Sequence, residues 1–201
     1  IVDHVQRNSE TGLVHDLRNP LTGLLGFLHG LRSEVADDAR EDVDNALIAA
    51  ARIKEATDDL LQIKAFEEGE LHATTALLPI DDVIAAAVGS MAGAAREREL
   101  TIRHQPSGLS APVDASLLRR AIENLLGNAV KHAPRGSSVE VCARAEGARV
   151  IVEVADHGAG VPDDKKRLLF TKFGTLDPNV KHTRRGFGLG LYLVHLVAEA
   201  H

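Results

Sequence analysis

Cysteine is almost absent from this chain of 201 residues, which contains only Cys142. One cysteine cannot form an internal disulfide, so no residue pattern indicates an oxidising compartment, and a reducing cytoplasm fits best. The sequence also has no CxxC or HExxH spacing, which excludes these common metal motifs. No run of apolar residues reaches the length of about 18 that a membrane-spanning helix needs.

Basic residues are in the minority, and the formal net charge is −6. A nucleic-acid-binding surface would require a concentrated basic face, so this balance argues against that class. Hydrophobic residues make up 44% of the chain although aromatic residues make up only 3%, which favours a globular protein over a disordered one. A chain of this length buries roughly 70% of its unfolded surface, enough for a core without disulfides.

The two ends of the chain affect how it is interpreted. It begins at Ile1 without a methionine and ends at His201, inside a segment with helical spacing. We therefore expect a fragment of a longer protein, with any anchor or sensory region outside this chain. The expected location is cytoplasmic for this fragment, while the full-length protein is either membrane-anchored or soluble.

Two apolar stripes at helical spacing occupy the first third of the chain. The first stripe consists of Leu13, Leu17, Leu21, Leu24, Leu28, Leu31 and Val35. After an acidic stretch over residues 34–42, the second consists of Val43, Ala46, Leu47, Ala50, Ile53, Thr57, Leu60 and Leu61. An isolated helical hairpin leaves an apolar face uncovered, so we expect two chains to pair into a four-helix bundle.

The apolar period changes after the break at residues 67–70. Period-two alternation over 139–145 and 150–154, around a turn at 146–147, predicts two antiparallel strands. Helical spacing covers four segments, residues 81–99, 114–132, 163–170 and 189–200. The irregular segment 171–185 is long enough to indicate either a lid or disorder. These features predict a second, α/β domain.

His15 lies on the side of the first helix opposite its leucines. At about 100° per residue, His15 falls about 160° from Leu17 and shares a polar face with Asn19 and Thr22. Pro20 removes a backbone donor in the same turn, which predicts a bend beside His15. Judged from this facing alone, an ordinary exposed histidine is an equal alternative to a functional one.

Three polar residues gather on one side of the segment 114–132. Asn124 and Asn128 are one helical turn apart, and Lys131 follows on the same side. Amide oxygens suit a hard cation such as Mg²⁺, which keeps its waters and bridges phosphates, and a lysine ammonium suits a phosphate tail. For these residues alone, a solvated helix face is the alternative.

Two glycine-containing segments follow later in the chain. Asp156 ends a predicted strand before Gly158 and Gly160, and a carboxylate there can accept from the exocyclic amine of adenine. The run from Gly186 to Gly190 opens a helix whose first N–H groups carry a partial positive charge suited to phosphate. Its GxGxG spacing is not GxGxxG, and no GxxxxGK[ST], HRD or DFG occurs, which excludes Rossmann, P-loop and protein-kinase folds.

These segments, in their order, resemble the motifs of two-component sensor histidine kinases. The run His15-Asp16-Leu17-Arg18-Asn19-Pro20-Leu21 resembles the H-box of that family. The other matching segments are residues 123–134 (N-box), 156–162 (G1), 169–173 (F) and 186–191 (G2). The resemblance covers nearly the whole chain.

The resemblance implies an α-helical hairpin forming a dimeric four-helix bundle, followed by an α/β two-layer sandwich, the Bergerat ATP-binding fold. The implied boundaries are 1–68 for the dimerisation and histidine phosphotransfer domain and 69–79 for a linker and first edge strand. Residues 80–201 are then the catalytic ATP-binding domain, whose C-terminal strands are missing after the last helix.

The implied activity is that of an ATP-dependent protein-histidine kinase. His15 is then the phosphoacceptor, and Asp16 orients its imidazole and takes up the proton. Asn19 orients water for a phosphatase reaction. The implied partners are a second copy of the chain and a response-regulator receiver domain whose aspartate takes the phosphoryl group. No nucleic acid is implied, and a membrane only through regions outside this chain.

The implied cofactors are ATP and Mg²⁺, with Asn124 and Asn128 holding the metal through the phosphates and Asp156 recognising adenine. The implied ATP-binding residues are Asn124, Asn128, Lys131, His132, Asp156, Gly158, Gly160, Phe173, Arg185, Gly186, Gly188, Leu189 and Gly190. Two positions depart from the family pattern. His157 replaces the usual asparagine of the G1 box, and His132 replaces the usual tyrosine or phenylalanine of the N-box.

Two other functions remain open at this point. A degenerate kinase would dock a receiver domain through the face of His15, Gly23 and Gly26 while its nucleotide site stays idle. An ATPase of the same fold is disfavoured, because related ATPases carry a water-activating glutamate where Asn124 stands. Glu123 is one residue away, which turns its side chain about 100° around the helix.

Overall fold

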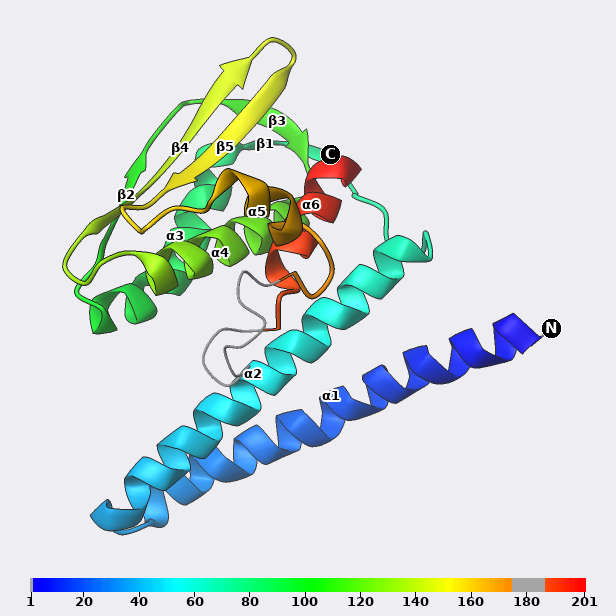
Figure 1. The fold of residues 1–201 in the computed structure, drawn as a ribbon, viewed down its shortest axis with the longest axis vertical. Coiled ribbons are helices and arrows are strands. Elements are labelled where there is room, and N and C mark those ends of the chain that lie inside the picture. Colours follow the sequence, from blue (N-terminus) through cyan, green and yellow to red (C-terminus); the bar gives the residue numbers. More distant parts are fainter. Residues whose placement is uncertain (1, 175–186) are drawn as a thin grey trace. The chain divides into compact units, whose positions relative to one another are not determined.

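The computed structural model describes residues 2–174 and 187–201, with side chains described from residue 18 onward. The chain divides into two compact units at the junction between Leu71 and His72, and the second unit also includes Gly190–His201 (Figure 1). Within the described part of the chain, no helix combines the length and the apolar composition needed to cross a membrane.

The first unit is the predicted helical hairpin. Helix α1 spans Val2–Glu34 and helix α2 spans Asp37–Glu67, so only two residues separate them. Helix α1 continues on both sides of Pro20, and the Thr22 hydroxyl donates to the Arg18 carbonyl at 2.9 Å. Asp37 and Asp38 lie in the first turn of α2, where negative charge is favoured by the helix dipole.

The two helices pack against each other with only part of each apolar stripe turned inward. Helix α2 buries Val43, Ala50 and Ile63. Leu24 differs from the other described residues of its predicted stripe, which are half-buried: its side chain is 45% exposed, whereas the next residue, Leu25, is half-buried. One residue rotates a side chain by about 100°, so Leu25 rather than Leu24 turns toward the interior of the hairpin. The hairpin therefore keeps an apolar surface outside its own interior.

Two small sheets form the strand layer of the second unit. Strands β1 (Ala76–Pro79) and β3 (Ser110–Val113) pair antiparallel. The second sheet has the order β2-β4-β5, with β2 (Thr101–Gln105) parallel to β4 (Ser138–Glu146). Strand β5 (Arg149–Ala155) is antiparallel to β4, as the alternating pattern predicts.

Helices cover one face of the three-stranded sheet (Figure 1). The helices of this unit are α3 (Ile80–Glu97), α4 (Ala115–His132), α5 (Asp163–Leu169) and α6 (Gly190–Ala200). Buried β4 residues such as Val139 and Val141 join Ile84 of α3 and Leu126 of α4 in one hydrophobic core. The intervening Glu140 and Arg144 are exposed, so the opposite face of the sheet is polar. The predicted two-layer α/β architecture is therefore confirmed.

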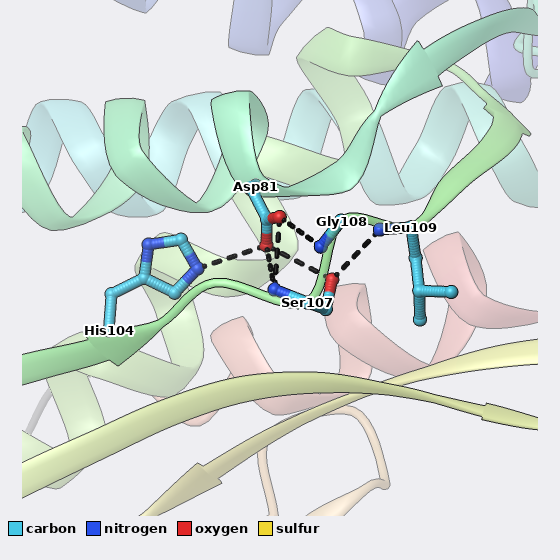
Figure 2. Close-up of polar contacts among 5 residues, drawn as sticks. All are labelled: Asp81, His104, Ser107, Gly108 and Leu109. Atoms are coloured by element: carbon cyan, nitrogen blue, oxygen red, sulfur yellow. Dashed lines mark hydrogen bonds and ion pairs between the residues drawn. The ribbon is translucent and has the colours of Figure 1, made fainter.

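The connection between β2 and β3 is held against the start of α3 by Asp81 (Figure 2). Its carboxylate accepts from the Ser107 amide at 3.0 Å and from the Gly108 amide at 2.7 Å. These backbone donors hold the pKa of Asp81 below its ordinary value. His104 Nε2 lies 3.2 Å from the same carboxylate. The ionised side chain thus ties one corner of the unit together.

Candidate functional site

The predicted phosphoacceptor lies on α1. His15 and Asp16 belong to this helix, but their side chains fall outside those the structure describes. Asn19 follows one turn later and is exposed. Its exposure leaves the amide available to water or to a second protein.

An ion-pair network joins α1 to α2 three residues after His15. Arg18 Nη2 lies 2.6 Å from Asp58 Oδ1, and Lys54 Nζ lies 2.7 Å from Asp58 Oδ2. Burial alone would raise the pKa of Asp58, but hydrogen bonds and charge from Lys54 and Arg18 outweigh it and lower this pKa. The network fixes the register of the two helices beside the phosphoacceptor position.

Helix α4 presents the predicted metal- and phosphate-binding side chains. Asp114 caps its first turn by accepting from the amides of Ser116 and Leu117 at 3.0 and 3.1 Å. The helix buries one face in the core, and Asn124, Asn128 and Lys131 are half-buried along a common face. Helical spacing therefore places these three as the sequence predicts.

Asn124 meets the start of α6. A Cβ atom added to Gly190 would lie 2.5 Å from Asn124 Oδ1, so any larger residue here would require the Asn124 side chain to move. The Asn124 Nδ2 atom is buried and has no hydrogen-bond partner among the described residues. An unsatisfied buried amide is costly, and a polar ligand at this position would satisfy it.

This arrangement fits a nucleotide carried with Mg²⁺. Within the described residues, no group of three or more His, Cys, Asp or Glu side chains is placed to hold a metal ion. A cation here would therefore depend on the amide oxygens of Asn124 and Asn128 together with phosphate oxygens and water, which is how Mg²⁺ commonly accompanies nucleotides.

The end of α4 meets the loop that carries Asp156. The Gly158 amide donates to Asp156 Oδ1 at 2.6 Å, and a Cβ added to Gly158 would lie 3.0 Å from the His132 carbonyl oxygen. His157 Nδ1 lies 3.1 Å from the Ser138 carbonyl oxygen, which links the loop to the start of β4. The structure thus gathers His132, Asp156 and Gly158, three predicted ATP-binding residues.

For the other predicted ATP-binding residues, the structure gives backbone conformation and exposure rather than contacts with the residues above. Gly160 and Phe173 both adopt positive φ, and the Phe173 side chain is 59% exposed after α5. Gly188 has a φ of 70°, and Leu189 is 3% exposed just before α6. Arg185 and Gly186 lie outside the described residues.

Glu123 points away from the predicted site. Its Oε1 accepts from Ser90 of α3 and from Arg119, each at 2.8 Å. This direction agrees with the expectation that a one-residue shift turns Glu123 away from the face of Asn124.

The two units each match a known protein family. Residues 6–69 match the His Kinase A (phospho-acceptor) domain. Residues 113–201 match the histidine kinase-, DNA gyrase B- and HSP90-like ATPase family. The chain therefore carries both domains of a two-component histidine kinase catalytic core, the phospho-acceptor domain and the ATPase domain.

Curated relatives agree with this assignment. The chain is 27% identical over 203 residues to the sensor protein KdpD of Clostridium acetobutylicum, covering 99% of this chain and 23% of that protein. It is 29% identical over 205 residues to the sensor-like histidine kinase SenX3 of Mycobacterium tuberculosis, covering 100% of this chain and 50% of that protein. The chain thus spans half or less of the length of these relatives.

Solved structures show the same architecture. The full-length structure of ShkA in complex with AMPPNP is similar with a TM-score of 0.74 and 26% identity, covering 94% of this chain and 40% of that one. The histidine kinase AdeS of Acinetobacter baumannii has the same fold, with a TM-score of 0.65 and 20% identity, covering 92% of this chain and 86% of that one.

Proposed function

We propose that this chain autophosphorylates His15 with Mg-ATP bound in its second unit and passes the phosphoryl group to an aspartate of a response regulator. We assign residues 1–68 to histidine phosphotransfer and dimerisation, 69–79 to a linker and first edge strand, and 80–201 to ATP binding. The similar ShkA structure was determined with AMPPNP, an ATP analogue, which supports an adenine nucleotide as the ligand here.

The packing of Asn124 against Gly190 carries the proposal. It brings the amide-bearing face of α4 to the glycine-rich start of α6, where the buried Asn124 Nδ2 atom has no partner in the described part of the chain. Helix starts favour phosphate, and amide oxygens favour Mg²⁺. The start of α6 and the amide of Asn124 lie next to each other, so a phosphate and its Mg²⁺ could bind at the same position.

Each proposed residue has a defined task. Mg-ATP supplies the phosphoryl group when bound. Asn124 and Asn128 would hold the metal, and Lys131 would neutralise phosphate charge, which is the main requirement of phosphoryl transfer. Asp156, held by the Gly158 amide, accepts from the exocyclic amine of adenine. His15 would take the γ-phosphoryl group on a ring nitrogen as its bond to the bridging oxygen breaks and ADP leaves, while Asp16 orients the imidazole and takes up its proton.

The hairpin supplies the proposed partner surfaces. Among the side chains that the structure describes in the hairpin, four large apolar ones are exposed, Leu24 at 45%, Phe27 at 69%, Ile48 at 51% and Ile53 at 47%. Pairing of two hairpins into a four-helix bundle would bury such groups, which supports a homodimer. We assign Asn19, exposed one turn after His15, to orienting water in a phosphatase reaction on the phosphorylated partner.

A calorimetric titration of the chain with Mg-ATP tests the nucleotide site separately from the histidine. We expect saturable binding that is retained in His15→Gln and lost in Asn128→Ala, with unchanged far-ultraviolet circular dichroism in both variants. Absence of binding to the unmodified chain would contradict the kinase proposal. In that case, retained binding of a receiver domain would favour the docking module.

A further inference from the structure

The Arg98 side chain spans the C-terminus of α4. Its Nη1 donates to the Lys131 carbonyl at 2.7 Å and its Nη2 donates to the Ala133 carbonyl at 3.2 Å. The last carbonyls of a helix lack partners within the helix, and a cation at this end is favoured by the helix dipole. Arg98 is half-buried, so both hydrogen bonds are partly shielded from water.

A tight turn at the end of α3 fixes the position of Arg98. The Arg98 amide donates to the Ala95 carbonyl at 3.1 Å, and the Leu100 amide donates to the same carbonyl at 2.9 Å. Between them Glu99 has a φ of 58°, in the left-handed region. The buried Leu100 anchors the chain after this turn. The guanidinium therefore extends to α4 from a backbone that is held by hydrogen bonds and by the buried Leu100.

The turn of α4 held by Arg98 also supports the proposed nucleotide residues. Lys131 belongs to this turn, and the carbonyl of its neighbour His132 packs against Gly158. The Gly158 amide in turn donates to Asp156. A shift of the last turn of α4 would therefore move both the lysine and the loop of the predicted adenine-binding carboxylate.

We propose that Arg98 is a positioning residue for the ATP site. By holding the Lys131 and Ala133 carbonyls, it keeps Lys131 in place for the phosphate tail and gives the loop 156–160 a fixed support. This inference rests on the proposed function. Arg98 acts through α4 and touches no nucleotide itself.

Three variants test the proposal. Arg98→Met removes both donors while keeping the apolar stem, and Arg98→Lys keeps one charged donor. Arg135→Met is the matched control: Arg135 Nη2 forms an exposed pair with Glu99 at 2.8 Å in the same corner of the unit. Each protein is measured for Mg-ATP affinity, for KM and kcat of autophosphorylation, and for amide hydrogen exchange over residues 156–160.

We expect Arg98→Met to raise Kd and KM about tenfold while kcat stays within about twofold. The two charge-assisted hydrogen bonds of Arg98 position residues that bind ATP, and Arg98 takes no part in the transfer step itself. Exchange over 156–160 rises in this variant. Arg98→Lys recovers part of the affinity and protection, and Arg135→Met matches the unmodified chain. If Arg98→Met does not fold, an intermediate Kd and exchange rate in Arg98→Lys support the proposal instead.

Two results would overturn this role. One is a lower melting temperature of Arg98→Met with unchanged Kd and unchanged exchange over 156–160, which marks a purely structural arginine. The other is an equal effect of Arg135→Met. If the unmodified chain itself binds no ATP, the proposed function fails, and the exchange comparison between the Arg98 and Arg135 variants still decides whether Arg98 holds the loop.

Discussion

Arg18 of α1 and Asp58 of α2 form an ion pair, with 2.6 Å between Nη2 and Oδ1, three residues after the proposed phosphoacceptor. Asp58 is the more enclosed partner, its side chain 15% exposed against 44% for Arg18, and it also pairs with Lys54. A kinase hairpin must present its histidine at a fixed register. The ion pair joins α1 to α2 close to the position of His15.

Replacing Arg18 by methionine should lower the free energy of unfolding by about 1 kcal/mol at pH 7. The pKa of Asp58 is lowered in the folded state, so this stabilisation is present above its ordinary value of 3.8 and is lost as pH falls below it. Urea unfolding at pH 7 and pH 3 measures both effects. Arg32→Met, which breaks the more exposed pair with Asp44, is the control and should cost less. Equal losses at both pH values would contradict the assignment.

The Asp81 contacts predict a second pH effect, in the α/β unit. Because the Ser107 and Gly108 amides lower the pKa of Asp81, its ionised form stabilises the fold above the ordinary value of 3.8, and this stabilisation disappears as pH falls below it. Asp81→Asn should therefore lower the melting temperature at pH 7 and lower it less at pH 3. Asp82→Asn, at the exposed neighbouring position, is the control. A deficit of Asp81→Asn that is constant with pH would refute this role.

Gly190→Ala should separate nucleotide binding from folding. The added Cβ would lie 2.5 Å from Asn124 Oδ1, the end of a side chain that can rotate away, so the melting temperature should change little. The displaced Asn124 should weaken Mg-ATP binding by about tenfold or more. Gly93→Ala is the matched control, because no atom lies within 4 Å of its added Cβ. Equal ATP affinities of the two variants would show that Asn124 does not contribute to the site.

Asp114 predicts a cap effect on α4. Its carboxylate accepts from the amides of Ser116 and Leu117, and its other oxygen accepts from the Thr74 amide at 3.0 Å. Asp114→Ala should therefore cost about 1 to 2 kcal/mol of stability, while Asp114→Asn retains most of it because an amide oxygen also caps helices. Chemical denaturation measures both, and a deficit of Asp114→Asn equal to that of Asp114→Ala would argue against the cap.

The long periodic elements could be predicted from the sequence. The stripes of the hairpin, the alternation around residues 146–147 and the segment ending at His132 all carry a clear period, and each appears in the structure near its predicted bounds. Strands β2 and β3 were not predicted. They have five and four residues, too few to show a period, and β3 contains Pro112, which is unfavourable within a strand.

The contacts that assemble the site could be predicted only in part. Helical spacing placed Asn124, Asn128 and Lys131 on one face of α4. The approach of Gly190 to Asn124 joins residues 66 positions apart, and the Arg98 bond to the Lys131 carbonyl spans 33. Contacts of this kind depend on how α3, α4 and α6 pack, and no local pattern specifies that packing.

Phosphorylation of His15 is tested most directly by transfer of label from γ-labelled Mg-ATP to the chain, followed by acid and base treatment of the product. We expect an acid-labile, base-stable phosphoryl group that is absent from His15→Gln and from Asn128→Ala, while His15→Gln still binds ATP. Label that survives acid, or label that persists in His15→Gln, would contradict phosphorylation of His15.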